Sequence, residues 1–212
     1  MTGPGLRERK KQRTRCALAQ AALRLFGERG YEETTIADIA AAADVSTRTF
    51  FSYYPSKEHV VFSDAEERAT LALAVIAERQ AGERPVDLLV RAVREVIGLS
   101  CGQLPARAVA ERTRLVKSVP ALQAHQLRMI HDAQQLLSEA LLAAYPSELD
   151  TLDARITVSV VMSAVLSASM FALESDQPDD LLWPVTEHAI DLAVHGLGSI
   201  GLARGDSREE GR

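Results

Sequence analysis

Apolar residues recur along most of the chain at spacings of three and four positions, and they are not grouped into alternating runs. This pattern is typical of amphipathic helices that bury one side. Leu18, Leu25 and Phe26 mark a first helix over about 9–29, and Gly30 supplies its stop. Further helices are predicted over 36–43, 47–54, 57–80, 86–99, 106–117, 120–145, 149–174 and 181–197. The chain is therefore predicted to be all-α.

Two of these boundaries depend on single residues. Ser56 is expected to cap the fourth helix, which should continue past Asp64. Pro184 is tolerated only in the first turn of a helix, because it lacks an N–H and its ring clashes with the preceding turn. It therefore fixes the start of the last helix near Leu181.

The stretch 34–57 combines two short helices with a tight turn. Thr35 and Asp38 have the spacing of a capping box. Asp44 tolerates the left-handed conformation that the turn requires, and Ser46 is a strong N-cap for the second helix. Two short helices joined in this way predict a helix-turn-helix.

The second of these helices carries side chains that suit DNA better than a protein core. Hydroxyls, one guanidinium and aromatic rings occupy nearly every face of Thr47–Tyr54. Hydroxyls can reach phosphates, and arginine recognises guanine in the major groove. An outward-facing helix of this kind predicts a DNA-binding surface.

Two consecutive runs carry a family resemblance, LFGERGYEETTIADIAAAADVS and then TFFSYYPSKE. Over about residues 14–60 the chain resembles the DNA-binding domain of the TetR family of transcriptional regulators. The resemblance implies a dimer that binds a palindromic operator, most often as a repressor, and is released by a small effector. The implied DNA contacts are Thr35, Ala37, Ser46, Thr47, Arg48, Thr49, Phe51, Ser52, Tyr53 and Lys57.

Several positions depart from the family pattern. Phe51 stands where the family has a tyrosine, so contact with a thymine methyl group replaces a polar contact. Arg48 stands where the family often has glycine and is expected to contact a base. Lys57 lies in the first turn of its helix, where the dipole disfavours a cation, so we expect a DNA phosphate to compensate it. His59 occupies the place of a capping-box glutamate.

The formal net charge of −5 conceals an uneven distribution. Residues 1–15 carry six Lys or Arg and one acidic residue, whereas the chain beyond residue 64 is acidic. A positive end on an acidic body is expected when only that end meets phosphate. A solvated tail is the alternative, but the helix-turn-helix that follows at once favours DNA.

No recognisable catalytic or metal-binding motif is present. The five histidines are His59, His125, His131, His188 and His195, and they lack H-E-x-x-H or any comparable spacing. The sequence has no glycine-rich phosphate loop and no G-x-S-x-G. It therefore predicts a protein that is not an enzyme and that binds neither metal nor cofactor.

Cysteine usage and hydropathy predict a cytoplasmic protein. Cys16 and Cys101 are too few and too far apart for a disulfide framework, and Cys101 has no basic neighbour to activate it. The charge-free run 156–173 reaches the lower edge of membrane-spanning length. Its serines and the acidic residues beyond both ends favour a buried helix without membrane contact.

These features predict two domains. Residues 1–64 form a helix-turn-helix DNA-binding domain, and residues 65–212 form a larger helical domain for effector binding and dimerisation. A homodimer follows because such proteins match their two-fold symmetry to a palindrome. Its interface is expected at Ser159, Ser163, Ser167, Ala189, Leu192 and Gly196. Alternatively, the regularly spaced serines face the domain's own core.

An apolar effector cavity is expected in the second domain, although each lining residue taken alone fits a plain core equally well. The expected lining is Phe62, Leu99, Leu115, Met129, Met162 and Phe171. The runs RTRLVKSVPAL and RTFF resemble a TetR subgroup associated with acyl-CoA-type ligands, with Arg107, Arg112 or Arg114 available for phosphates. A helical protein–protein scaffold is the competing function, and it leaves the basic N-terminal segment and the polar recognition helix without a role.

Overall fold

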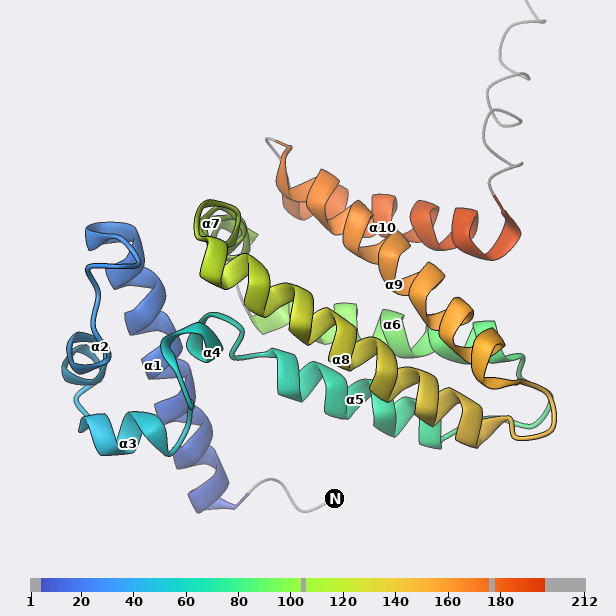
Figure 1. Cartoon of the computed structure of the whole chain (residues 1–212), viewed down its shortest axis with the longest axis horizontal. Helices are drawn as coiled ribbons and strands as arrows, with labels where there is room; N and C mark the ends of the chain where they lie inside the picture. Colours follow the sequence, from blue (N-terminus) through green and yellow to red (C-terminus); the bar gives the residue numbers. More distant parts are fainter. Residues whose placement is uncertain (1–4, 104–105, 176–177, 197–212) are drawn as a thin grey trace, which may run out of the picture. The chain divides into compact units, whose positions relative to one another are not determined.

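The computed structural model describes residues 5–103, 106–175 and 178–196, while the side chains of 6, 8, 99–110 and 178–180 lie outside this description (Figure 1). Every regular element in the described ranges is an α-helix, which confirms the predicted fold class. The helices are α1 (Leu6–Arg29), α2 (Ile36–Ala42), α3 (Thr47–Phe51), α4 (Lys57–Val61), α5 (Ala65–Ala77), α6 (Pro85–Gln103), α7 (Ala106–Ser118), α8 (Pro120–Ala144), α9 (Thr151–Leu173) and α10 (Pro178–His195).

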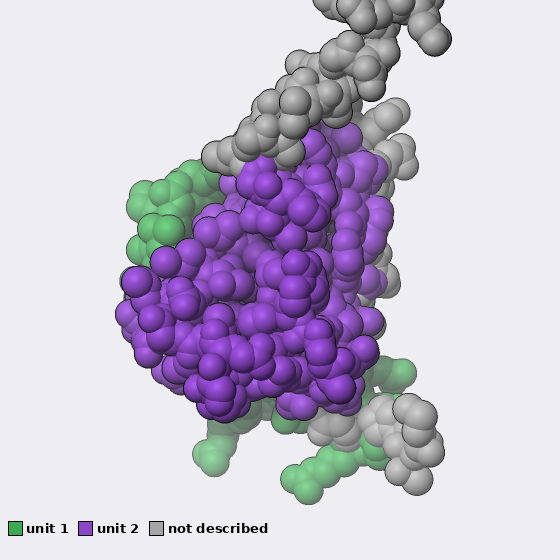
Figure 2. Space-filling view, turned by 90° about the vertical axis from the view of Figure 1, so that its right-hand side faces the viewer, with its two compact units in different colours: residues 1–68, 111–129 green, residues 69–110, 130–212 purple. Residues whose placement is uncertain are grey.

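The helices group into two compact units (Figure 2). The N-terminal unit consists of residues 1–68 and 111–129, and the C-terminal unit consists of residues 69–110 and 130–212. Helices α5, α7 and α8 each contribute residues to both units. No pattern in the sequence assigned the segment 111–129 to the same unit as the helix-turn-helix.

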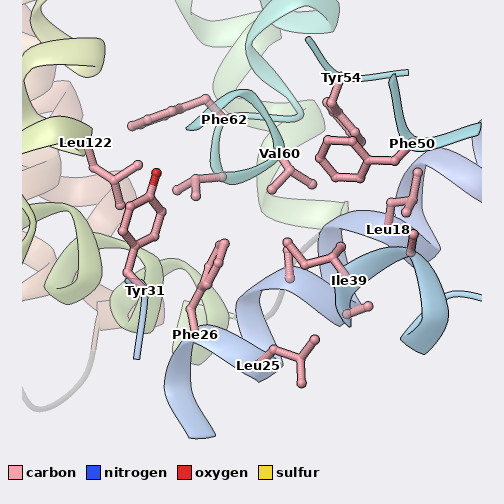
Figure 3. Packing of buried hydrophobic residues seen from close by; sticks show 14 of the residues in the cluster. Leu18, Leu25, Phe26, Tyr31, Ile39, Phe50, Tyr54, Val60, Phe62 and Leu122 are labelled. Carbon is pink, nitrogen blue, oxygen red and sulfur yellow. The ribbon is translucent and has the colours of Figure 1, made fainter. Parts of the chain in front are cut away.

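The core of the N-terminal unit forms where the apolar sides of its helices meet (Figure 3). Helix α1 contributes Leu18, Leu25 and Phe26, as its spacing predicts. The other buried members include Ile39 of α2, Phe50 of α3, Val60 and Val61 of α4, Val116 of α7 and Leu122 of α8. Burying each large side chain stabilises the fold by about 1.5–3 kcal/mol, so this core fixes where α2 and α3 lie on α1.

The predicted caps of the helix-turn-helix are confirmed. The Thr35 hydroxyl accepts a hydrogen bond from the amide of Asp38, whose carboxylate accepts one from the amide of Thr35. Asp44 has a φ of 54°, the left-handed conformation that the turn requires. The Ser46 hydroxyl accepts a hydrogen bond from the amide of Thr49 and caps α3.

The single helix predicted over 57–80 is wrong, because residues 62–64 separate α4 from α5. Phe62 has φ −108° and ψ 36°, outside the helical region, and its ring is buried in the core. The carbonyl of Ser63 accepts a hydrogen bond from the Arg15 guanidinium at 2.8 Å. These tertiary contacts outweigh the weak helical preference of the intervening residues.

Helix α3 is shorter than the predicted 47–54 and ends at Phe51. The amides of Tyr53 and Tyr54 both donate to the carbonyl of Phe50, which closes the helix in a turn. The Tyr54 ring is buried, and its hydroxyl donates to the Arg15 carbonyl at 3.2 Å. Burial of this ring, in addition to Pro55, therefore determines where the helix ends.

The predicted start of the last helix is also wrong. Helix α10 begins at Pro178, and Pro184 lies inside it. Proline suits the first helical position, so Pro178 provides the start that the sequence pattern assigned to Pro184. An interior proline costs one backbone hydrogen bond, and here the proline lies on an exposed side of the helix.

Helix α9 buries one side within its own unit, while Ile156 and Phe171 on other sides are exposed. Its buried residues are Ala154, Val158, Val161, Ala168 and Ala172. They pack within the C-terminal unit, where α9 lies against α10 and also contacts α6. A bidentate ion pair between Arg94 of α6 and Glu187 of α10, at 2.9 and 2.6 Å, connects these two helices directly.

Candidate nucleic-acid interface

The predicted contact residues of the helix-turn-helix are largely exposed. Ala37 of α2 and Thr47, Arg48, Phe51 and Ser52 at α3 all face solvent. This outer surface exists because Ile39 and Phe50 turn the opposite sides of the two helices into the core. We call the exposed side chains of Thr47, Arg48 and Phe51 the α3 surface.

Several of the hydroxyls that were predicted to contact DNA already make hydrogen bonds within the protein. The Ser46 and Thr49 side-chain oxygens lie 2.9 Å apart, and the Ser52 hydroxyl donates to the Arg48 carbonyl at 3.1 Å. Thr35 is engaged in its capping box. These hydroxyls therefore hold the local backbone, and the α3 surface offers the groups that remain for a ligand.

Two members of the α3 surface differ from an ordinary solvated helix. Phe51 is 56% exposed, and its ring meets that of buried Phe50 edge-on at 5.6 Å. An anchored apolar ring on a polar surface can contact a thymine methyl group. No hydrogen bond or ion pair engages the Arg48 guanidinium among the described residues, so it is available to a base. Tyr53, by contrast, is half-buried against the core.

Lys57 points into the protein. Its ammonium donates to the carbonyls of Tyr31 at 2.6 Å and Thr34 at 3.1 Å, and it lies 4.0 Å from the centre of the Tyr31 ring. A cation in the first turn of a helix needs compensation. The carbonyl oxygens and the ring of Tyr31 provide it within the protein.

Glu58 makes a second connection to Tyr31, which the sequence pattern did not reveal. The Tyr31 hydroxyl donates to the Glu58 carboxylate at 2.9 Å, and the Ser56 hydroxyl donates to the same carboxylate. Burial and then the hydrogen bond to Glu58 raise the pKa of Tyr31 well above its usual 10, so the phenol stays protonated. No sequence pattern marks this contact, because it depends on the tertiary fold that brings residues 31 and 58 together.

The start of α1 presents a row of cations. Arg7, Arg9, Lys10, Lys11 and Arg13 are exposed. Arg15 differs, because its guanidinium pairs with Glu66 at 3.2 Å and donates to the Ser63 carbonyl. We call the five exposed cations the basic patch of α1. This patch ends before Arg15, where α1 begins to pack on the core.

The predicted effector-pocket residues are divided between the two units. Phe62, Leu115 and Met129 join the core of the N-terminal unit, whereas Met162 joins that of the C-terminal unit. Phe171 is 62% exposed on α9. The side chain of Leu99 and that of Arg107 lie outside the described residues.

A small hollow occurs in the C-terminal unit. It has a volume of about 100 Å³ and is lined by Gln135, Ser138, Glu139, Leu142, Thr151, Ala154 and Arg155. Ligand pockets usually measure several hundred Å³, so this hollow does not match an elongated effector. Of the other cations proposed for an anionic ligand, Arg112 is paired with Asp64 at 3.0 Å, and Arg114 is exposed.

The predicted dimer residues lie on both helices expected to carry them. Ser163 and Ser167 are exposed on α9, and Ser159 is half-buried. Ala189 and Leu192 are half-buried on α10, and Gly196 follows the end of that helix with a φ of 87°. The two serines therefore do not belong to the core of their own unit.

Sequence comparison and structural comparison agree on one family. Residues 18–63 match the family described as bacterial regulatory proteins, tetR family, and residues 83–198 match the MftR C-terminal domain. The HTH-type transcriptional regulator TcmR of Streptomyces glaucescens is 38% identical over 152 residues, which are 70% of this chain and 67% of TcmR.

Two solved structures share the fold. SmeT, the repressor of the Stenotrophomonas maltophilia multidrug efflux pump SmeDEF, was solved with triclosan; its TM-score is 0.56 at 18% identity, covering 86% of this chain and 90% of SmeT. FadR of Bacillus subtilis, solved with stearoyl-CoA, has a TM-score of 0.53 at 19% identity, covering 86% of this chain and 98% of FadR. The chain belongs to the TetR family of bacterial regulatory proteins and is a DNA-binding transcriptional regulator.

Proposed function

We propose that the protein is a homodimeric, effector-released repressor that binds a palindromic operator through α3. The observation that carries this proposal is the α3 surface, where a guanidinium that no described residue engages and an anchored apolar ring stand side by side on a helix positioned by the core. A scaffold protein has no need for this combination beside the basic patch of α1. The DNA-binding domain would comprise residues 1–64, and residues 65–212 would bind effector and partner.

Each group on the DNA side has a distinct role in this proposal. Arg48 donates two hydrogen bonds to guanine, and Phe51 contacts a thymine methyl group. Thr47, Tyr53 and the basic patch of α1 contact phosphates, which fix register without reading sequence. Lys57 holds the loop before α2 in place, so its contribution to DNA binding is one of positioning.

The proposed dimer surface is the outward stripe of α9. Its members are exposed residues that recur every three or four positions along the helix: Leu152, Ile156, Val160, Ser163, Ser167 and Phe171. By length and composition alone, helix α9 is long and apolar enough to cross a membrane, and 22% of its most apolar 18-residue stretch is buried. In a cytoplasmic DNA-binding protein such a stripe needs a cover, and a second copy provides one through the same stripe.

The proposed effector is a small apolar molecule. Triclosan in SmeT and stearoyl-CoA in FadR are apolar or carry a long apolar chain, and both proteins share the fold of this chain. An effector releases DNA only if it prefers the conformation that fits the operator less well. Titrating the operator complex with acyl-CoAs of increasing chain length tests the acyl-CoA variant of the proposal, and operator affinity that stays constant across the series would exclude it.

The operator proposal is tested by selection from a pool of random duplex DNA. We expect the enriched sequences to share an inverted repeat with guanine and thymine in each half-site. The variant Arg48→Ala/Phe51→Ala should lose this preference while still retaining DNA at low salt, because the basic patch is intact. A pool that shows no enrichment with the wild-type protein would favour the scaffold function.

A further inference from the structure

His125 of α8 is a buried histidine with an unsatisfied nitrogen. The residue is 9% exposed, and its Nε2 has no hydrogen-bond partner within the described part of the chain. Buried polar groups are nearly always hydrogen-bonded, because desolvation without a partner costs free energy. The unpartnered Nε2 of His125 therefore needs an explanation.

The His125 ring is enclosed by two other rings from the N-terminal unit. The Phe62 ring stacks on it with centroids 5.4 Å apart and an interplanar angle of 26°. The His59 ring of α4 meets it edge-on at 4.5 Å and 70°. His59 in turn places its Nδ1 2.9 Å from the Ser56 hydroxyl. His125 thus forms the contact through which the start of α8 packs on α4.

The surroundings of the ring favour its neutral form. The charged or titratable groups that face it are Glu58 and His59 from α4 and Arg128 from its own helix. Burial lowers the pKa of His125 below its usual 6.5, His59 and Arg128 lower it further, and Glu58 opposes them. An imidazolium also carries an N–H on both nitrogens, so protonation would bury an Nε2–H that lacks an acceptor.

Helix α4 connects this histidine to the DNA-binding helices. The Glu58 carboxylate holds the Tyr31 hydroxyl, and the Lys57 ammonium holds the carbonyls of Tyr31 and Thr34. Thr34 immediately precedes Thr35, the cap of α2. A change in the way α8 packs on α4 is therefore transmitted, through two hydrogen-bonded side chains, to the loop that sets the position of α2.

We infer that His125 is a proton-sensitive positioning residue: its neutral ring seats α8 on α4, and its protonation loosens that contact and weakens operator binding. The effect on DNA rests on the proposed function. A histidine whose pKa is lower in the folded protein than in the unfolded chain stabilises the fold fully at pH values above the unfolded-chain pKa. This stabilisation is lost as the pH falls through the folded-state pKa. The affected range thus lies below pH 6.5, and the protein responds to mild acid.

The test compares the pH response of two variants on the same helix. Operator affinity and stability to urea are measured at pH 7.5 and 5.5 for the wild type, His125→Phe and His131→Phe. Phenylalanine keeps the stacking on Phe62 but cannot be protonated, whereas His131 is exposed and serves as the matched control. All three proteins share the remaining ionisable groups, so the difference isolates His125.

The expected loss of affinity and stability on acidification is larger for the wild type and His131→Phe than for His125→Phe. For every unit by which a histidine pKa is lower in the folded protein than in the unfolded chain, full protonation lowers the folding equilibrium constant by about tenfold. Equal pH responses in all three proteins would overturn the inference. If the wild type binds no operator at pH 7.5, the proposed function fails, while the urea series still decides the role of His125.

A second measurement does not depend on the folding of any variant. The proton NMR signal of the His125 ring in the wild-type protein should titrate with a midpoint below pH 6.5. Amide signals of residues 57–61 should shift over the same range, because α4 loses its contact. A midpoint at or above 6.5, or α4 signals that stay constant through the titration, would overturn the inference.

Discussion

The ammonium of Lys57 lies 2.6 Å from the carbonyl oxygen of Tyr31 and 4.0 Å from the centre of the same residue's ring. One side chain thereby ties the first turn of α4 to the loop between α1 and α2. Its position near a helix N-terminus, which is unfavourable in isolation, becomes favourable through this contact.

Replacing Lys57 should affect stability more than electrostatics. Lys57→Met removes two charge-assisted hydrogen bonds, and we expect the free energy of unfolding to fall by about 1.5–3 kcal/mol, measured in urea. The dependence of operator affinity on salt should keep its slope. Lys10→Met is the matched control: it should leave stability unchanged and reduce the slope by about one. The opposite assignment of the two effects would make Lys57 a phosphate contact.

Arg48 should determine the preference for one symmetric base pair. Arg48→Ala should reduce discrimination at that pair by about 1–3 kcal/mol, measured by competition between operator variants, with little change in salt slope. Arg48→Lys keeps the charge but loses the planar fork, so it should relax specificity as well. Specificity that survives in Arg48→Lys would contradict bidentate recognition of guanine.

The ion pair between Asp64 and Arg112 should stabilise the N-terminal unit. Burial raises the pKa of Asp64, but Arg112 and Arg68 outweigh it and bring the pKa below its usual 3.8. Removing one partner of a largely buried pair is costly, so Arg112→Met should lower the free energy of unfolding by about 3 kcal/mol at pH 7. The double variant Asp64→Asn/Arg112→Met should recover part of this loss.

The same pair predicts a pH dependence separate from that of His125. Because the folded-state pKa of Asp64 is lowered, its stabilisation is complete above pH 3.8 and is lost as the pH falls through the folded-state value. Unfolding measured from pH 7 to 2 should show the gap between wild type and Arg112→Met closing in this acidic range. A gap that is independent of pH would show that packing, rather than charge, explains the effect.

The α9 stripe should hold the dimer together. Ile156 is 51% exposed on α9, and Leu127 is 68% exposed on α8. Ile156→Glu should yield a folded monomer of 23.1 kDa in sedimentation, whereas Leu127→Glu should remain a dimer. A wild-type protein that sediments as a monomer at micromolar concentration, or two variants that behave alike, would exclude this interface.

The sequence predicted the parts of the fold that depend on local chemistry. The capping box of Thr35, the left-handed Asp44 and the Ser46 cap each act within a few residues, so their pattern is visible along the chain. The break at Phe62 was missed because it depends on Arg15 and on burial of the ring, which are distant in sequence.

The same distinction applies to the candidate site. The exposed α3 surface could be predicted, because the polar residue types of Thr47–Tyr54 and the family resemblance both indicate a helix that faces outward. The engagement of Lys57 with Tyr31 could not, because it requires the path of the chain between α1 and α4. A periodic pattern shows which side of a helix is apolar, but the neighbours of a long cation are determined by the tertiary fold.

We propose that α3 and the basic patch of α1 together recognise a specific operator. The most direct measurement is the affinity of the purified protein for a selected operator and for a scrambled duplex, over a series of salt concentrations. We expect the operator to bind at least about 10³ times more tightly at physiological salt, with affinity for both duplexes falling steeply as salt rises. Equal affinity for the two duplexes, or affinity that salt does not change, would show that these surfaces do not recognise an operator.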